Sequence, residues 1–492
     1  MKMLLPTAAA LGSLFVVAFQ LQLLPFFAHL FVEDRLVWPV IFYGVWACVI
    51  GVTLVLLVLH GSVRRQSLPV LAVCASAMLV TLIHPIDGVA KNFLVAATFV
   101  ACVSVLAIAS APFALLRFSA TAAVLSAVIC LLDILFSHGF TNTVGRAAGL
   151  SINANVAAAG LLLGAASSFW TVPPRWRSPF LLIVGTGILV TLSRSTLLAA
   201  ILIGSGIAAD LIWMRIRSPG PRSRIRWLHT GALILALAGW IAAALFSNDR
   251  FSVAARSSFL QIGAVPTAFA EARQAIADSL RTNAASEIIR EITRRAENEG
   301  DINSISARGL LMERAWLIYR TGPFFGRGMA AAHAAQPHNT FLLFAVAFGH
   351  LGWIVPLALL GLTVYPVRSV QQLPMFFATF TVMMTSHDLP FTFGLLAPLI
   401  LGIAGLNAQR CRVNDKPEAV AAIRYVAAAA PVVFVTGVFS ILTIRSSSMA
   451  GPPNLLFFLV FCAITLWSLG VWRWYRELLQ REHDLPRGYG WA

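Results

Sequence analysis

The chain has 492 residues, of which 59% are hydrophobic and only 11% are charged, and its mean hydropathy is +0.81. This composition excludes a soluble domain with one anchor and predicts an all-α fold, a polytopic transmembrane helical bundle. The net charge of +16 comes mostly from arginine, which favours retention of basic loops in the cytoplasm before it favours an anionic ligand.

Apolar runs in chain order predict about twelve to fourteen membrane spans, at roughly twenty residues for each span. They cover residues 5–32, 36–60, 68–84, 92–111, 118–138, 153–172, 178–193, 195–214, 228–247, 340–366, 372–387, 389–408, 422–444 and 453–475. The first run is too long for a cleaved signal segment, so we expect it to be a span. The spans divide the chain into N-terminal membrane helices (1–247), an extramembrane loop domain (248–339), C-terminal membrane helices (340–475) and a cytoplasmic tail (476–492).

The positions of the basic residues predict how these spans are oriented. With the N-terminus in the cytoplasm, every cytoplasmic loop carries arginine or lysine, as the positive-inside rule requires. The loop domain at 248–339 then faces the periplasm. Arg146 and Arg194 lie in outer loops and oppose this bias, so they are better candidates for a functional role than the basic residues of the inner loops.

The loop domain is expected to be small and mainly helical. Mixed Arg and Glu with apolar residues at helical spacing predict helices over 266–281 and 284–297, and a third from Ser304 to Arg320. Three short helices at a membrane surface could form a lid or a cradle for a substrate that enters from the lipid. Most of their charges are typical of a solvated helix face.

Three predicted helix starts on the outer side carry candidate ligand-binding residues. Arg146 precedes the first start in a Gly-rich loop, with Asn155 in the first turn; Arg194 lies at the second start; His338 and the capping residue Asn339 form the third. Helix N-termini attract phosphates, and arginine supplies forked, permanently charged donors. If the three starts converge, Arg146, Arg194 and His338 would surround an anionic group.

His338 lies at the positive end of a predicted helix dipole. This field disfavours the imidazolium and favours the neutral imidazole, which can accept a proton. A structural histidine bonded to backbone is the default for an arbitrary position, but the neighbouring arginines and the polar cap favour a catalytic role. For Arg194, a snorkelling role at a helix end stays open.

The other ionisable residues of this half of the chain have weaker signals. Packing, surface exposure and ligand contact all stay open for four arginines: Arg308, Arg314, Arg320 and Arg327. Structural roles are expected for five isolated histidines: His84, His138, His333, His350 and His387. His387 with Asp388 is as typical of a turn as of a site.

A metal-dependent transferase would need carboxylates near the outer face to hold a divalent ion. Glu33-Asp34 is the only compact candidate pair, and one short acidic pair is a weak metal signal. The six cysteines indicate neither a disulfide framework nor a zinc site. We therefore expect a site without metal or cofactor, in which arginines stabilise the charge; a nucleotide loop of the GxxxxGK[ST] type is also absent from the sequence.

Several short motifs occur in a characteristic order. They are Arg146-Ala147-Ala148-Gly149-Leu150, Ser193-Arg194-Ser195-Thr196 and, in the run that begins at Arg308, Gly322-Pro323-Phe324-Phe325-Gly326-Arg327-Gly328, Pro337-His338-Asn339-Thr340-Phe341 and Gly349-His350-Leu351-Gly352. With the many spans and one large late outer loop, they resemble the O-antigen ligase and polymerase superfamily of bacterial inner-membrane glycosyltransferases. The resemblance covers residues from about 140 to 360. The family's usual Trp a few residues after the first arginine is replaced by Met312.

The resemblance implies transfer of a glycan from an undecaprenyl diphosphate carrier at the periplasmic face of the inner membrane. In the ligase branch the acceptor is a sugar hydroxyl of lipid A–core, and the product is lipopolysaccharide. The expected partners are these two substrates and membrane lipids, with no nucleic acid. We expect an inverting, metal-independent displacement with His338 as general base, diphosphate bound by Arg146, Arg194, Arg308 and Arg314, and support from Asn155, Asn339 and Arg327.

Three alternative functions stay open. A glycan polymerase of the same superfamily would extend a chain that is linked to the carrier. A protein O-oligosaccharyltransferase would use a Ser or Thr acceptor; such relatives often have an added C-terminal domain, for which the tail after Arg473 is too short. A transporter or flippase would place ionisable groups at mid-membrane, whereas Asp133 and Asp210 lie toward the ends of their predicted spans.

Overall fold

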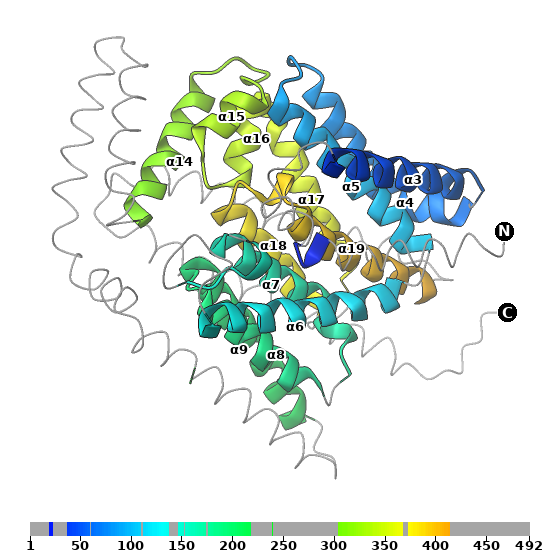
Figure 1. Ribbon diagram of the computed structural model, residues 1–492, viewed down its shortest axis with the longest axis vertical. Helices are drawn as coiled ribbons and strands as arrows, with labels where there is room; N and C mark the ends of the chain where they lie inside the picture. Colours follow the sequence, from blue (N-terminus) through cyan, green and yellow to red (C-terminus); the bar gives the residue numbers. More distant parts are fainter. Residues whose placement is uncertain are drawn as a thin grey trace.

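The computed structural model describes residues 19–22, 37–59, 61–109, 112–136, 146–151, 153–173, 176–217, 239, 304–367 and 372–413. Within these ranges the regular elements are helices, and no strand occurs. Figure 1 shows α3, α4 and α5 on one side of α16 to α19, with α14 and α15 on the other side and α6 to α9 packed together beside α18. The mostly helical fold that the sequence predicted is confirmed for the described residues.

Most of the described helices overlap predicted spans, although α4 and α6 begin six or seven residues earlier than predicted and the span predicted at 340–366 is divided among α16, η5 and α17. The described helices are α3 (Val37–Leu59), α4 (Gly61–Thr81), α5 (Gly88–Ala109), α6 (Pro112–Phe136), η2 (Gly149–Ser151), α7 (Ala154–Ser168), η3 (Phe169–Thr171), α8 (Arg177–Val190), α9 (Arg194–Arg217), α14 (Ser304–Arg320), α15 (Met329–Ala335), α16 (Thr340–Phe348), η5 (Gly349–Trp353), α17 (Ile354–Val364), α18 (Leu373–Thr385), η7 (Leu389–Phe391) and α19 (Phe393–Val413). The other predictions lie outside the described residues, apart from 19–22 and 239: the spans 5–32, 228–247, 422–444 and 453–475 and the loop helices 266–281 and 284–297.

Four segments in the described part of the chain are long and apolar enough to cross a membrane. They are Gly88–Ala109, Leu115–Asp133, Ala154–Thr171 and Thr340–Val364. Their lengths meet the requirement of roughly twenty residues for a hydrocarbon core about 30 Å thick. These segments are consistent with the membrane protein that the composition predicted.

The last of these segments is not one straight helix. α16 ends after nine residues, and Gly349 follows with a φ of +62°. The rings of Phe341 and Trp353 have centroids 6.3 Å apart, whereas twelve residues of straight α-helix would span roughly 18 Å. A Cβ at Gly352 would overlap the carbonyl of Phe344. The single continuous span that hydropathy predicted here is therefore broken at η5.

Small residues set the distances between the central helices. A Cβ at Gly187 of α8 would lie 2.8 Å from Ala127 Cα of α6, and a Cβ at Gly402 of α19 would lie 2.8 Å from Ser167 Cβ of α7. Backbones approach closely only where side chains are this small, which is the usual mode of helix packing in membranes. Overpacking of such contacts typically costs about 1–3 kcal/mol.

These contacts also fix the direction of each helix. Gly160 of α7 faces Leu395 of α19, and Ser167 faces Gly402, so α7 and α19 run parallel. Met375, near the start of α18, meets Gly402, so α18 runs antiparallel to both helices. α7 and α19 therefore begin where α18 ends.

The start of α16 lies at the same end of the bundle. The hydroxyl of Thr340 donates to the carbonyl of Ser386 at 2.7 Å, so α16 begins beside the end of α18. Gly187 of α8 meets Leu161 of α7, so α8 ends, and α9 begins, near the start of α7. We call this end of the bundle the helix-start end; it is formed by residues 146–155, 191–196, 336–340 and 386–393.

Candidate active site

Three histidine rings lie together at the helix-start end. The ring centroid of His387 is 4.9 Å from that of His338 and 5.9 Å from that of His333, with both pairs edge to face. Asp388 adds a carboxylate, with its Oδ1 atom 3.6 Å from His387 Nε2. We call His333, His338 and His387 the histidine cluster. It joins α15, the residue before the α16 cap and the turn after α18 in one place.

The backbone around His338 is unusual. Gln336, which ends α15, and His338 both have positive φ angles, +45° and +46°. Non-glycine residues rarely adopt this left-handed conformation, which costs about 1 kcal/mol or more. Such a conformation persists only where surrounding contacts hold it, and it brings the ring of His338 against His387.

Side-chain hydrogen bonds hold the start of α16 in place. Asn339 is the N-cap, and its Oδ1 accepts a hydrogen bond from the backbone N–H of Leu342 at 3.0 Å. Its amide Nδ2 donates to the carbonyl of Met384 at 3.4 Å, and Thr340 donates to Ser386. Asn339 and Thr340 are each 1% exposed. Both therefore act as buried ties that bring the residue before α16 to the turn after α18.

His387 is kept neutral by its surroundings. The residue is only 8% exposed, and this burial lowers the pKa of His387 from its ordinary value of 6.5. The charge of Asp388 opposes the lowering of the pKa, and His333 adds to it. Its buried Nδ1 has no hydrogen-bond partner among the described residues. A neutral imidazole with one unsatisfied ring nitrogen therefore stands beside His338.

Arg146 connects three parts of the helix-start end. Its Nε donates to the carbonyl of Thr191 at 2.9 Å, and its NH2 group donates to Oδ1 of Asn155 at 2.9 Å. The guanidinium thereby joins its own loop to the first turn of α7 and to the turn between α8 and α9. Two of its five N–H donors thus serve to position the helix starts, a function that the sequence pattern did not reveal.

A buried carboxylate holds the loop that carries Arg146. Asp133, 1% exposed near the end of α6, accepts hydrogen bonds from the backbone N–H groups of Ala148 at 2.8 Å and Gly149 at 3.0 Å. An acidic residue in the last turn of a helix is disfavoured by the helix dipole, and the two N–H groups compensate for this. Asp133 is therefore a structural carboxylate.

For the other predicted arginines, the structure gives the position on the chain and fewer side-chain contacts. Arg194 is the first residue of α9 and follows the turn that Arg146 contacts, while Arg308 lies on α14; both side chains lie outside the described part. Arg314 lies on α14 with its Nε buried. Arg327 is exposed, and its NH2 group donates to the carbonyl of Thr321 in the same loop at 3.5 Å.

The structure thus brings several predicted residues to one end of the bundle. Arg146 and Asn155 are hydrogen-bonded, His338 adjoins Asn339, and α7 and α16 both pack against α18. The sequence predicted structural roles for His333 and His387 and did not reveal that their rings lie with that of His338. Within the described ranges, no group of three or more His, Cys, Asp or Glu residues has an arrangement that could hold a metal ion; Glu33 and Asp34 lie outside these ranges.

Comparison with known proteins does not assign a family to the chain. A scan against protein-family models and a search of curated proteins both find no match. The geometry of the helix-start end and the motif resemblance therefore remain as the basis for a functional proposal.

Proposed function

We propose that the chain is an O-antigen ligase, a membrane glycosyltransferase that moves a glycan from undecaprenyl diphosphate to a sugar hydroxyl of lipid A–core. One observation carries the proposal. His338, at the capped start of α16, contacts a second, neutral histidine at the end of the bundle where Arg146 and the start of α9 also lie. A proton acceptor and permanently charged donors on one end of a helical bundle suit the transfer of a glycan from an anionic leaving group.

In the proposed reaction, His338 takes the proton from the acceptor hydroxyl as that oxygen attacks the anomeric carbon. The bond between the anomeric carbon and the diphosphate oxygen breaks, and the configuration inverts. His387 stands edge-on to the base and holds its orientation. General base catalysis of this kind typically contributes about 10²–10⁴-fold to the rate.

The departing diphosphate gains negative charge, and the proposal assigns its stabilisation to arginines. Arg146, Arg194, Arg308 and Arg314 are the candidates; fixed guanidinium donors stabilise a developing anion without reorganisation at the moment of reaction. The starts of α7 and α9 add positive dipole ends. No metal ion is needed for this step in the proposal, and the donor carries its own activation in the diphosphate linkage.

Both substrates of this reaction are lipid-anchored, which requires a site at the edge of a bilayer. The proposal therefore includes a polytopic arrangement in the bacterial inner membrane, with residues 248–339 and the helix-start end facing the periplasm. Four segments that are long and apolar enough to cross a membrane support the membrane location, and the basic residues of the predicted inner loops support the orientation.

The test is expression of the chain in a bacterial strain that lacks its own O-antigen ligase. The proposal predicts that surface O-antigen returns and that carrier-linked polymer no longer accumulates. If the protein instead restores long glycans in a strain that lacks its own O-antigen polymerase, the protein is a polymerase. Failure to restore O-antigen, with the chain present in the membrane, would count against the ligase assignment.

A further inference from the structure

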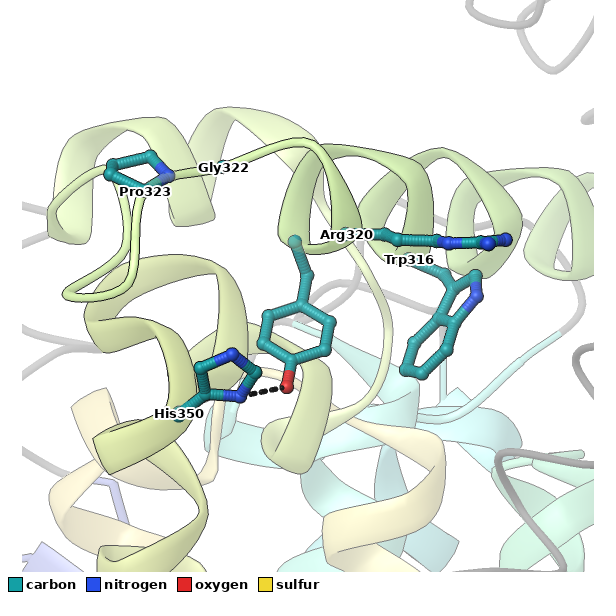
Figure 2. Close-up of a pocket in the computed structure, with 6 residues that line it drawn as sticks. Trp316, Arg320, Gly322, Pro323 and His350 are labelled. Carbon is teal, nitrogen blue, oxygen red and sulfur yellow. Dashed lines mark hydrogen bonds between the residues drawn. The ribbon is translucent and has the colours of Figure 1, made fainter.

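A hollow lies away from the histidine cluster. It has a volume of about 290 Å³ and is lined by Trp316, Tyr319, Arg320, Gly322, Pro323 and His350 (Figure 2). It is enclosed by the last turn of α14, the loop that follows and the start of η5. α16, roughly 13 Å long, separates His338 before its first residue from His350 beyond its last, so the two sites are distinct. We call this hollow the α14 pocket.

A chain of hydrogen bonds holds the ring of His350. Trp353 Nε1, which can only donate, lies 3.3 Å from the hydroxyl of Tyr319, and that hydroxyl lies 2.8 Å from His350 Nδ1. The tyrosine accepts from the tryptophan and still has its own proton to donate, which Nδ1 of a neutral imidazole can accept. In this arrangement the proton of neutral His350 is on Nε2, which gives the wall of the pocket an N–H donor.

Figure 2 shows the second ring nitrogen of His350 turned away from the hydrogen bond, while Arg320 and Trp316 extend side by side from α14 on the other side of the pocket. Arg320 is exposed and has no ion-pair partner among the described residues. Among the described residues, no carboxylate lines the α14 pocket. Arg320 therefore gives the pocket a guanidinium, whose forked N–H donors bind phosphate oxygens.

The rim of the pocket is apolar. Phe324 and Phe325 are 59% and 47% exposed, although both are large aromatic residues. The ring centroid of Phe324 lies 5.1 Å from that of His350, so the apolar surface begins at the wall of the pocket. Exposed aromatic rings beside a polar pocket are typical of sites that contact lipid tails at a membrane boundary.

We propose that the α14 pocket binds the phosphate headgroup of an anionic lipid. Arg320 contacts the phosphate oxygens, Trp316 covers one side of the headgroup, His350 forms the opposite wall, and Phe324 and Phe325 contact the acyl chains of the lipid. This inference goes beyond the proposed function and does not depend on it, because it uses no residue assigned to glycan transfer.

The test measures binding to the purified full chain in detergent by native mass spectrometry. The probes are dihexanoyl phosphatidic acid, the uncharged dihexanoyl glycerol and inorganic phosphate. We expect phosphatidic acid to bind. Dihexanoyl glycerol and inorganic phosphate should each bind at least about tenfold more weakly, since charge and acyl chains both contribute to the affinity. Equal binding of dihexanoyl glycerol would refute the anion site, and equal binding of inorganic phosphate would refute a lipid as its source.

Variants localise the binding. Arg320→Gln should weaken phosphatidic acid binding about tenfold or more, and Tyr319→Phe should weaken it less, by releasing the orientation of His350. Arg117→Gln, which changes an exposed arginine on α6, is the matched control for the general attraction of a basic protein and should bind as the wild type does. Wild-type binding by Arg320→Gln, or an equal loss in Arg117→Gln, would overturn the proposal.

Discussion

The ring of His387 stands edge-on to the ring of His338, with centroids 4.9 Å apart and planes at 76°. Aromatic pairs in this arrangement contribute about 0.5–1.5 kcal/mol beyond the area that they bury. The contact therefore fixes a preferred orientation for a histidine whose own backbone is in the left-handed region. In the proposed mechanism, this orientation directs the imidazole of His338 toward the sugar hydroxyl that it deprotonates.

The first prediction distinguishes the role of the His387 ring contact from a direct role of its nitrogen atoms. His387→Ala should lower the turnover rate roughly tenfold with little change in KM for either substrate, because a loosely held base is less often aligned. His387→Phe retains the edge-to-face contact and should recover most of the rate. Steady-state kinetics of the two variants provide the measurement. Equal losses in both would mean that the nitrogens act directly and that the positioning role is wrong.

The lowered pKa of His387 makes stability depend on pH. In the unfolded chain this histidine takes up a proton near pH 6.5, while the folded chain resists protonation. The unfolded state therefore binds more protons below that pH, and the free energy of unfolding should fall as pH falls through this window. Thermal unfolding followed from about pH 8 to about pH 5 measures the slope. His387→Phe should flatten it, and an unchanged slope in the variant would contradict the assignment.

Asp133 should be more important for stability than a carboxylate that is only partly buried. Asp133→Ala leaves the N–H groups of Ala148 and Gly149 unsatisfied, which predicts a loss of about 2 kcal/mol or more. Asp87→Ala is the matched control, since Asp87 caps α5 through a single bond to Ala90 N–H at 2.7 Å and should cost about 1 kcal/mol. Chemical denaturation compares the two. A smaller loss for Asp133→Ala than for the control would show that the loop does not depend on this carboxylate.

The break after α16 depends on glycine. Gly349 has a φ of +62°, and a Cβ there would overlap the carbonyl of Phe324, so Gly349→Ala should destabilise the chain by about 2 kcal/mol or more. Gly361→Ala in α17, where a Cβ has nothing within 4 Å, should be neutral or stabilising by about 0.5–1 kcal/mol. Melting temperatures of the pair provide the readout. A tolerated alanine at 349 would mean that the helix can continue through this point.

Local signals in the sequence were sufficient for much of the fold. The predicted helix from Ser304 to Arg320 coincides with α14, because Gly322-Pro323, just beyond Thr321, ends the helical pattern. The break at Gly349 could not be predicted in the same way. Both sides of it are apolar, and the contact that imposes it is with Phe324, whose carbonyl accepts a hydrogen bond from the N–H of His350. Hydropathy contains no information on that contact.

In the candidate site, too, local features could be predicted from the sequence and contacts between distant residues could not. Asn339 as a helix cap and His338 before it are local features, so the sequence alone identified them. The position of His387 beside His338 is set by the packing of α16 against α18, across nearly fifty residues of chain. The bond from Arg146 to Thr191 likewise joins residues 45 apart in sequence. Such pairings depend on helix directions, which short motifs do not specify.

The role of His338 as general base is tested by glycan transfer with purified His338→Ala protein. The assay combines a lipid-linked glycan donor with lipid A–core and follows the ligated product on a gel. We expect the transfer rate to fall by about 10²–10⁴-fold, with an unchanged melting temperature. A His338→Ala protein that transfers glycan at the wild-type rate would contradict this role.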